Sequence, residues 1–474
     1  MCHIGASGAT ASGLSPTALR PAFLPVRPPA GAGRYLAPSA VEDSLASTPT
    51  QGSARLAAGH AGGTAEPLAL WHTSPRAAVA AVMALGLGAF CFVTTENLPI
   101  GLLPVISSGL HTSVTSVGLL VSAYAVVVVV ASPPLTHLTR RLPRRGLMGA
   151  LLAIFVLANL AAAASPGYWW LFGARVVTAG AQAVFWSVGP VTAVSLFGPE
   201  ARSRAVAGVL GGSSTGVVLG VPAGTWLGQQ GGWRLPFVVL AAMGVVVLAG
   251  IAVALPRYHP RDTHAGSGSL PSRRRYLLLL ATTVLLVAGF DTSYTYVTSF
   301  LTHVAGIAAR DVPSALLVAG AATGLGVVAS GLGFQRWPRL STVSPVAGMA
   351  GGLFALFALG TRPVPAVLFE AVASLALGAF VIVNQNRVLM VAPGSTDAAS
   401  AWTSTAFNVG IAGGSFTGGL VMPALGARYT ALVGALLALG GALTVGYDDL
   451  SHHRPGPPTL HAQGADGSGR AGPG

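Results

Sequence analysis

The stretch AAVAAVMALGLGAFCFVTTENLPIGLLPVI, residues 77–106, is apolar apart from a few polar side chains and a single charge, Glu96. A helix that spans a membrane needs about 20 predominantly apolar residues, so this run predicts a transmembrane helix. Because an ionisable side chain inside the bilayer is costly, Glu96 is a candidate for proton or substrate handling. The alternative is that Glu96 lies near the outer end of the helix, where its side chain extends to water.

The composition extends this prediction to the whole chain. Only 8% of the residues are charged and 52% are hydrophobic, whereas a soluble domain has about 25% charged residues. All 26 basic residues are arginines, and most of those outside the two tails fall in short connections between apolar runs, a pattern that argues against a nucleic-acid partner. Cys2 and Cys91 provide neither a disulfide framework nor the spacing of metal ligands. The sequence therefore predicts an all-α integral membrane protein without a cofactor or metal.

The apolar runs predict about twelve spanning helices in two bundles of six. A polar, Pro- and Gly-rich connection, residues 256–274, separates a bundle at 76–255 from one at 275–447. Tails rich in Ala, Gly and Pro, residues 1–75 and 448–474, are predicted to be disordered, and the first is either a cytoplasmic tail or the product of a misassigned start. The predicted spans are 77–106, 113–134, 146–164, 168–197, 204–227, 235–255, 275–301, 314–334, 343–360, 363–390, 398–422 and 429–447.

The connections also predict the orientation of the chain. If the N-terminus is inside, most loop arginines fall in inner connections, and the outer ones hold only Arg234, Arg310, Arg362 and Arg428. Because cytoplasmic loops of membrane proteins are enriched in Lys and Arg, both termini are predicted to be cytoplasmic.

Short motifs recur in the two halves. The sequence GGSSTG at residues 211–216 returns as GGSFTG at residues 413–418, an offset of 202 residues. Leu-Phe at residues 171–172 returns at residues 368–369, an offset of 197 residues. An internal repeat of this kind is expected of a transporter built from two related bundles.

Three motifs point to one family. They are TENLPIGLLP at residues 95–104, GLLVSAY at residues 118–124, and GVVLGVPAG at residues 216–224 followed by Gly-Gln and Gly-Trp-Arg. With these motifs the chain resembles transporters of the major facilitator superfamily, in the branch of bacterial drug:proton antiporters that includes sugar, purine-nucleoside and chloramphenicol exporters. The resemblance implies a location in the bacterial cytoplasmic (inner) membrane, and Arg175 matches the fourth-span arginine of the superfamily, while Gln182 stands where relatives often have histidine.

Two segments are candidates for gating and helix packing. The loop LTRRLPRR at residues 138–145 is similar to the superfamily's inner-loop motif but lacks its aspartate, so the aspartate's contacts are not transferred. The fifth span combines small residues with a proline that bends the helix, so that another backbone can approach closely; ordinary static packing is the alternative. The candidates are Arg140, Arg141, Arg144, Arg145, Gly216, Gly220, Pro222 and Gly224.

Charged residues inside the predicted spans suggest a proton-coupling site. The resemblance places spans 1, 4, 7 and 10 around a central cavity, and helix rise puts Glu96, Arg175, Asp291 and Glu370 at similar depth in the outer half. Glu96 and Arg175 are predicted to form a switchable pair, because desolvation favours a protonated carboxyl and a nearby arginine favours the anion. The alternative is a permanent ion pair. Asp291, 195 residues after Glu96, is a weaker proton candidate. Glu370 is weaker still, and the alternative for it is a place at the membrane surface near Arg362.

Polar and aromatic residues on the cavity helices and the eleventh span are candidates for substrate contacts, although packing or an interfacial belt would use the same residue types. No basic cluster faces the predicted cavity, which suggests a neutral or amphipathic organic solute rather than a phosphorylated one. The candidates are Gln182, Phe185, Trp186, Tyr294, Tyr296 and Asn408.

The chain has no lysine and thus no standard ATP-binding P-loop, so an enzyme is not expected and an ion gradient is the expected energy source. The expected function is proton-coupled efflux of a drug, sugar or nucleoside-like solute by alternating access, carried out by a monomer. The alternatives are solute uptake by proton symport and a transporter-like membrane sensor that binds solute without moving it.

Overall fold

Helices form the framework of the chain. The computed structural model describes residues 74–256, 270–333, 338–394 and 396–452, and within these ranges it contains no strand. The predicted tails, at residues 1–73 and 453–474, and most of the predicted connection at 256–274 lie outside the described residues. The helices run in the order α1 (Pro75–Gly109), α2 (Val114–Thr139), α3 (Arg144–Ala163), α4 (Tyr168–Ser195), η3 (Pro199–Ala201), α5 (Arg202–Thr215), η4 (Gly216–Gly220), α6 (Val221–Gly231), α7 (Leu235–Ala254), α8 (Arg273–Tyr294), α9 (Val297–His303), η5 (Ala309–Asp311), α10 (Val312–Gly333), α11 (Pro338–Leu359), α12 (Pro363–Val391), α13 (Thr396–Leu425) and α14 (Ala427–His452).

Several helices begin at serines that satisfy their first free backbone donors. The Ser74 hydroxyl accepts from the backbone N–H of Ala77, and Pro75 occupies the first helical position of α1, where no intrahelical donor is needed. Ser113 accepts in the same way from the N–H of Ser116 at the start of α2, at 3.0 Å. These local signals set where the apolar runs become helical.

The membrane architecture predicted from the sequence is confirmed. Eleven helical segments in the described part of the chain are long and apolar enough to cross a membrane. The remaining predicted span, 398–422, coincides with α13, which is long enough at 30 residues but more polar. Since α13 packs on α8 and α2, much of its surface faces other helices.

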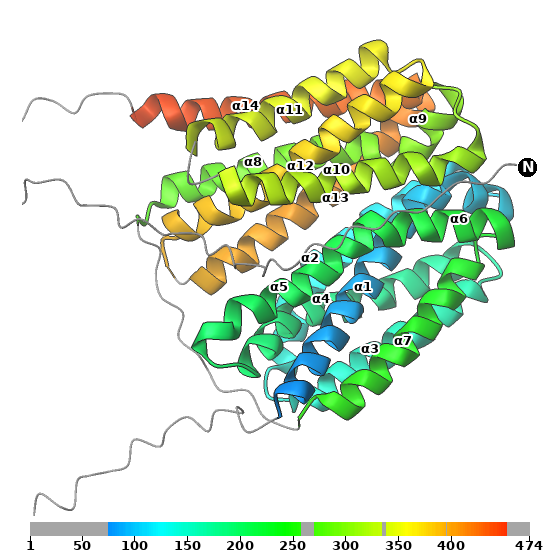
Figure 1. The fold of residues 1–474 in the computed structure, drawn as a ribbon. Coiled ribbons are helices and arrows are strands. Elements are labelled where there is room, and N and C mark those ends of the chain that lie inside the picture. Colours follow the sequence, from blue (N-terminus) through cyan, green and yellow to red (C-terminus); the bar gives the residue numbers. More distant parts are fainter. Residues whose placement is uncertain (1–73, 257–269, 334–337, 395, 453–474) are drawn as a thin grey trace, which may run out of the picture. The chain divides into compact units, whose positions relative to one another are not determined.

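The helices are arranged in two groups, α1–α7 and α8–α14, which lie on opposite sides in Figure 1. Buried hydrophobic side chains form one main cluster in each group. A few residues join the cluster of the opposite group, among them Tyr296 in the first and Ile100 and Val221 in the second. Each group therefore has its own core, and the exceptions mark where the two groups touch.

Two predicted spans are not single α-helices. The fifth, predicted at 204–227, passes through a π-helical turn, η4, directly before Pro222, consistent with a proline that disturbs the helical hydrogen-bond pattern. The seventh, predicted at 275–301, is divided into α8 and α9 by Thr295 and Tyr296. Thr292 in the preceding turn donates its hydroxyl to the carbonyl of Ala288 at 2.6 Å, a back-bond that bends helices.

Candidate functional site

Two prolines in α1 leave carbonyl oxygens free for other helices. A proline has no N–H to donate to the carbonyl four residues earlier, so Pro99 frees the carbonyl of Thr95 and Pro104 frees that of Ile100. Inside a membrane such groups must find partners within the protein. Arg175 and Thr298 supply them, one from α4 and the other from α9.

Arg175 is anchored to the backbone of α1. Its side chain is 3% exposed; Nη1 donates to the Thr95 carbonyl at 2.5 Å, and Nη2 donates to the Glu96 carbonyl at 2.8 Å. The guanidinium also lies over the ring of Tyr124, 4.5 Å from its centroid. The arginine thus connects α4 to α1 and α2; both of these hydrogen bonds go to neutral carbonyls, and its Nε has no hydrogen-bond partner among the described residues.

The Glu96 carboxylate is bound by an amide instead of the arginine. Gln182 Nε2 donates to Glu96 Oε2 at 2.7 Å, and Gln182 Oε1 accepts from Tyr124 Oη at 2.8 Å. Among the described residues no ion pair within 4.0 Å joins Glu96 to Arg175. The predicted direct pair is therefore corrected to a network in which Arg175 binds the backbone of Glu96 and Gln182 binds its carboxylate.

Two polar residues of this network were absent from the sequence-based candidates. Tyr124 links Gln182 to Arg175, and Asn159 on α3 accepts from the Thr95 hydroxyl at 2.8 Å. Tyr124 ends the motif at residues 118–124, where a hydroxyl-bearing ring in an otherwise apolar run is the available signal. Asn159 had a similar signal, as a single amide in the apolar helix α3.

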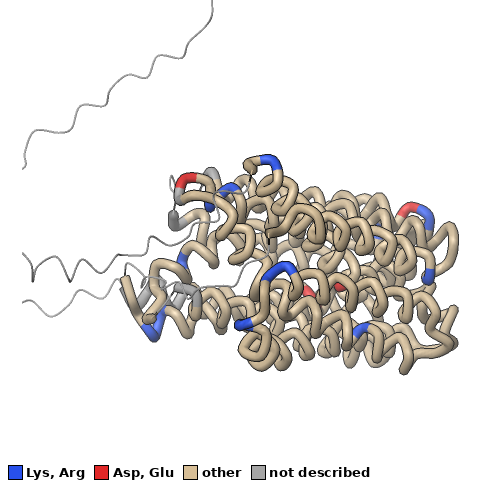
Figure 2. The backbone as a smooth tube through the Cα atoms, turned by 90° about the horizontal axis from the view of Figure 1, so that it is seen from below, with Lys and Arg blue, Asp and Glu red and all other residues tan. Residues whose placement is uncertain are grey.

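Buried acids of both groups lie in this region, and Figure 2 shows acidic positions well inside the helical part of the chain. Asp291 on α8 is 8% exposed and lies within electrostatic range of Glu96, so these two carboxyls approach each other across the two groups. Glu370 on α12 is 3% exposed. Its side chain is therefore enclosed by other helices and does not extend to the surface beside the exposed Arg362, which was the alternative for this residue.

The candidate substrate residues occupy different surroundings. Phe185 is fully buried and packs on Phe92, with ring centroids 4.9 Å apart, so it belongs to the core of the first group. Trp186 is partly buried against the same core. Tyr296 is also fully buried, where a side chain on Gly118 would otherwise stand, and its hydroxyl donates to the Ser415 carbonyl at 3.4 Å. It is a contact between the two groups and does not line an open cavity.

Tyr294 and Asn408 complete this set. Tyr294 stacks on Phe290 with centroids 4.9 Å apart and keeps a small exposed fraction. Asn408 is partly buried, and its amide donates to the Ser404 carbonyl of its own helix at 3.0 Å. Two of the candidates lie beside the buried acids: Gln182 binds Glu96, and Tyr294 is within electrostatic range of Asp291 and Glu370.

A stripe of glycines in the fifth span faces α1. A Cβ atom added to Gly216 would come 2.9 Å from the Phe90 carbonyl, and one added to Gly220 would overlap Thr94. Gly224 meets Leu98 in the same way. Thr94 donates its hydroxyl to the Gly216 carbonyl at 3.4 Å. The close approach is therefore within one group, between α1 and η4–α6.

The arginines of the α2–α3 connection do not form one cluster. Arg140 and Arg141 are exposed, whereas Arg144 is buried at the start of α3. Arg145 donates to the Ala252 carbonyl near the end of α7. Arg145 therefore ties the start of α3 to the end of α7.

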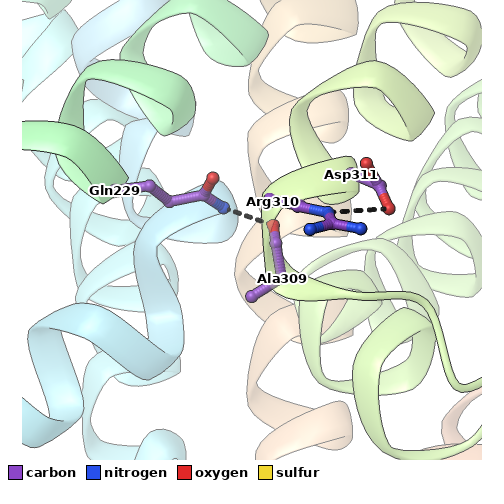
Figure 3. Close-up of polar contacts among 4 residues, drawn as sticks. All are labelled: Gln229, Ala309, Arg310 and Asp311. Carbon is purple, nitrogen blue, oxygen red and sulfur yellow. Dashed lines mark hydrogen bonds and ion pairs between the residues drawn. The ribbon is translucent and has the colours of Figure 1, made fainter.

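The two groups are joined by a few polar contacts. Ser122 on α2 and Ser415 on α13 have their hydroxyl oxygens 2.7 Å apart. Thr298 donates to the Ile100 carbonyl at 2.8 Å. At the tip of α6, Gln229 Nε2 donates to the Ala309 carbonyl at 2.7 Å, beside the exposed pair Arg310–Asp311 (Figure 3). These bonds connect the halves without merging their cores.

Comparison with known proteins identifies the family. A family model described as the Major Facilitator Superfamily matches residues 85–414. The chain belongs to the Major Facilitator Superfamily. This transporter is 33% identical over 390 residues to an uncharacterized MFS-type transporter, YtbD, of Bacillus subtilis (strain 168), covering 79% of this chain and 97% of that one.

Other relatives of the transporter carry more informative names. A probable sugar efflux transporter of Mannheimia succiniciproducens is 32% identical, over 77% of this chain and 91% of its own length. The inner membrane transport protein YdhP of Escherichia coli (strain K12) is 32% identical, over 75% and 92%. A solved bacterial homolog of the human lysosomal transporter Spinster, inward-facing and occupied, matches with a TM-score of 0.63 and 17% identity, over 80% and 98%. That likeness shows the fold.

Proposed function

We propose that this MFS transporter exports a small organic solute in exchange for protons across a bacterial cytoplasmic membrane, as a monomer, by alternating access of its two bundles. The observation that carries the proposal is the state of Glu96, a carboxylate inside α1 that is held by the neutral amide of Gln182. A carboxylate held in this way can take up a proton without breaking an ion pair. The export direction is supported by a relative named as a probable sugar efflux transporter.

Protonation of Glu96 would reverse the polarity of its hydrogen bonds. A protonated carboxyl is a donor, whereas the ionised form only accepts. Gln182 would then turn its amide so that its carbonyl oxygen accepts from Glu96 and its NH2 group faces Tyr124. Tyr124 lies on α2 two residues from Ser122, which touches α13 of the other bundle. A proton on Glu96 is thereby linked to a contact between the bundles.

Replacing the carboxyl tests this role. In everted vesicles, Glu96→Gln is expected to reduce substrate-driven proton movement to the level of vesicles without the transporter, because glutamine fills the same space but cannot exchange a proton. The substrate is first selected from pentoses, nucleosides and antibacterial drugs by resistance or efflux in a hypersensitive host. Proton movement is followed with a pH-sensitive dye.

Glu200→Gln is the matched control, because Glu200 lies in the short exposed turn η3. The control is expected to keep the wild-type flux. Undiminished substrate-coupled flux in Glu96→Gln would remove Glu96 from the mechanism.

The direction of transport is tested in whole cells with and without an uncoupler. An exporter gives higher accumulation of the substrate when the proton gradient collapses. Lower accumulation would show uptake by symport, and unchanged accumulation would show a sensor that binds the solute without moving it. Either of these results would overturn the proposed export.

A further inference from the structure

Glu370 is a buried carboxyl whose oxygens have no partner in the described part of the chain. Neither Oε1 nor Oε2 makes a hydrogen bond. One helical turn further along α12, the hydroxyl of Ser374 is also buried without a partner. Buried polar groups are almost always hydrogen-bonded, because leaving them unpaired costs free energy. Three neighbouring oxygen acceptors without donors therefore indicate a missing group.

The helix α8 completes the surroundings of Glu370. Tyr294 lies within electrostatic range of both Glu370 and Asp291. Its ring stacks on that of Phe290, one turn earlier in α8, with the ring centroids 4.9 Å apart. These side chains thus offer carboxyl oxygens and aromatic rings, which are the two kinds of group that bind an ammonium ion.

Within the described part of the chain, no ion pair joins Glu370 to an arginine. Arg310 pairs with the exposed Asp311, and Arg175 is held by the carbonyls of α1. Of the other helices packed on α12, α10 has no titratable residue. His303 on α9, Arg339 on α11 and Asp397 on α13 stand near the ends of their helices.

The internal repeat places Glu370 at the position that a cation, Arg175, occupies in the first bundle. Arg175 and Glu370 each stand seven residues after the first residue of their helix, Tyr168 in α4 and Pro363 in α12. They are 195 residues apart, the same offset that separates Glu96 from Asp291. In the first bundle this position holds a cation beside an acid, and in the second bundle it holds a second acid.

We propose that Glu370, Ser374 and the Phe290–Tyr294 ring pair form a binding subsite for a protonated amine on the transported solute. The three N–H donors of a primary ammonium match the three free acceptors, Glu370 Oε1, Glu370 Oε2 and Ser374 Oγ. Without ligand the carboxyl holds a proton, since an unpaired buried carboxylate is costly. Binding then leaves the net charge of the subsite unchanged, because one cation replaces another: the ammonium enters, the carboxyl O–H bond breaks, and water carries the released proton away.

This subsite rests on the proposed transport function, but binding can be measured without transport. The probe is benzylamine, compared with benzyl alcohol, which has the same ring and no charge. Calorimetric titration of the purified full-length protein is expected to show benzylamine binding about tenfold or more tightly, as for a hydrogen-bonded charge. Titration in buffers of different ionisation heat is expected to show one proton released per bound amine.

Three variants decide the outcome. Glu370→Gln is expected to abolish both the preference for the amine and the proton release, and Ser374→Ala to weaken amine binding while keeping the release. Glu200→Gln is expected to behave as wild type. If Glu370→Gln does not fold, Glu370→Asp must shift the affinity for benzylamine more than that for benzyl alcohol.

Equal binding of the two probes by the wild type, or proton release that persists in Glu370→Gln, would overturn the subsite. Failure of the proposed function has a different signature. In that case benzylamine still binds with proton release, while vesicles show no substrate-driven proton movement. Conversely, Glu96-dependent flux together with equal binding of both probes would leave transport standing and remove the subsite.

Discussion

Oxidation of the double variant Ser122→Cys/Ser415→Cys is expected to stop transport completely, and reduction is expected to restore it. The two hydroxyl oxygens are 2.7 Å apart and belong to α2 and α13, one in each bundle. Cysteine at both positions therefore places two sulfur atoms within reach of a disulfide bond. Because alternating access requires the bundles to move against each other, a covalent bond at this contact blocks the cycle. Uptake of the selected substrate into everted vesicles gives the readout.

A cross-link within one bundle is the matched control. Ser132 on α2 and Ser187 on α4 have their hydroxyl oxygens 3.3 Å apart, and both belong to the first bundle. Ser132→Cys/Ser187→Cys is expected to form the disulfide and keep transporting, because the bundle moves as one body. Each single variant must be insensitive to oxidation, which also tests whether the buried native Cys91 takes part. Full activity of the oxidised Ser122–Ser415 pair would show that this contact does not open.

Replacing Gly212 with alanine is expected to destabilise the transporter strongly, whereas the same change at Gly211 is expected to be harmless. A Cβ at position 212 would overlap the backbone of Gly86 in α1, and backbone atoms cannot rotate away. Overpacking of this kind costs about 1–3 kcal/mol, occasionally more. At Gly211 nothing lies within 4 Å of the added Cβ, and alanine favours a helix over glycine by about 0.5–1 kcal/mol. Thermal inactivation of the purified variants measures both.

The second bundle allows the same comparison. Gly414 faces the backbone of Ala288 on α8, and Gly413 has nothing within 4 Å. Gly414→Ala is thus expected to lower the inactivation temperature and Gly413→Ala to leave it unchanged or raise it. Equal effects of neighbouring substitutions in either bundle would mean that the α1–α5 and α8–α13 contacts yield more easily than the structure indicates.

The membrane fold was predictable from the sequence because a spanning helix has a length and polarity that few other structures share. The residues near the central acids were also predictable in part, since Glu96, Arg175 and Asp291 are conspicuous in apolar runs. Their partners were not predictable from charge alone. Coulomb attraction suggested that Arg175 would bind the Glu96 carboxylate, but the carbonyls near Pro99 compete for the same donors.

The break between α8 and α9 and the burial of Glu370 were not predictable for a second reason. Both depend on how helices pack, which a hydropathy pattern does not describe. The run of Thr and Ser residues near Tyr296 is apolar enough to predict one helix, although the hydroxyl of Thr292 binds the backbone of the preceding turn. Glu370 is seven residues inside α12, a depth at which either snorkelling or burial is possible until the neighbouring helices are known.

The separation of the two hydrophobic cores has an energetic consequence for the transport cycle. Since each bundle keeps its own core, changing the angle between them moves little apolar surface into or out of contact, and the access states can lie close in free energy. One proton moving down a gradient of two pH units releases about 2.7 kcal/mol. That is enough to change a two-state population ratio about 100-fold. A weak driving force, acting on a small number of polar bonds, can therefore control the motion of the whole protein.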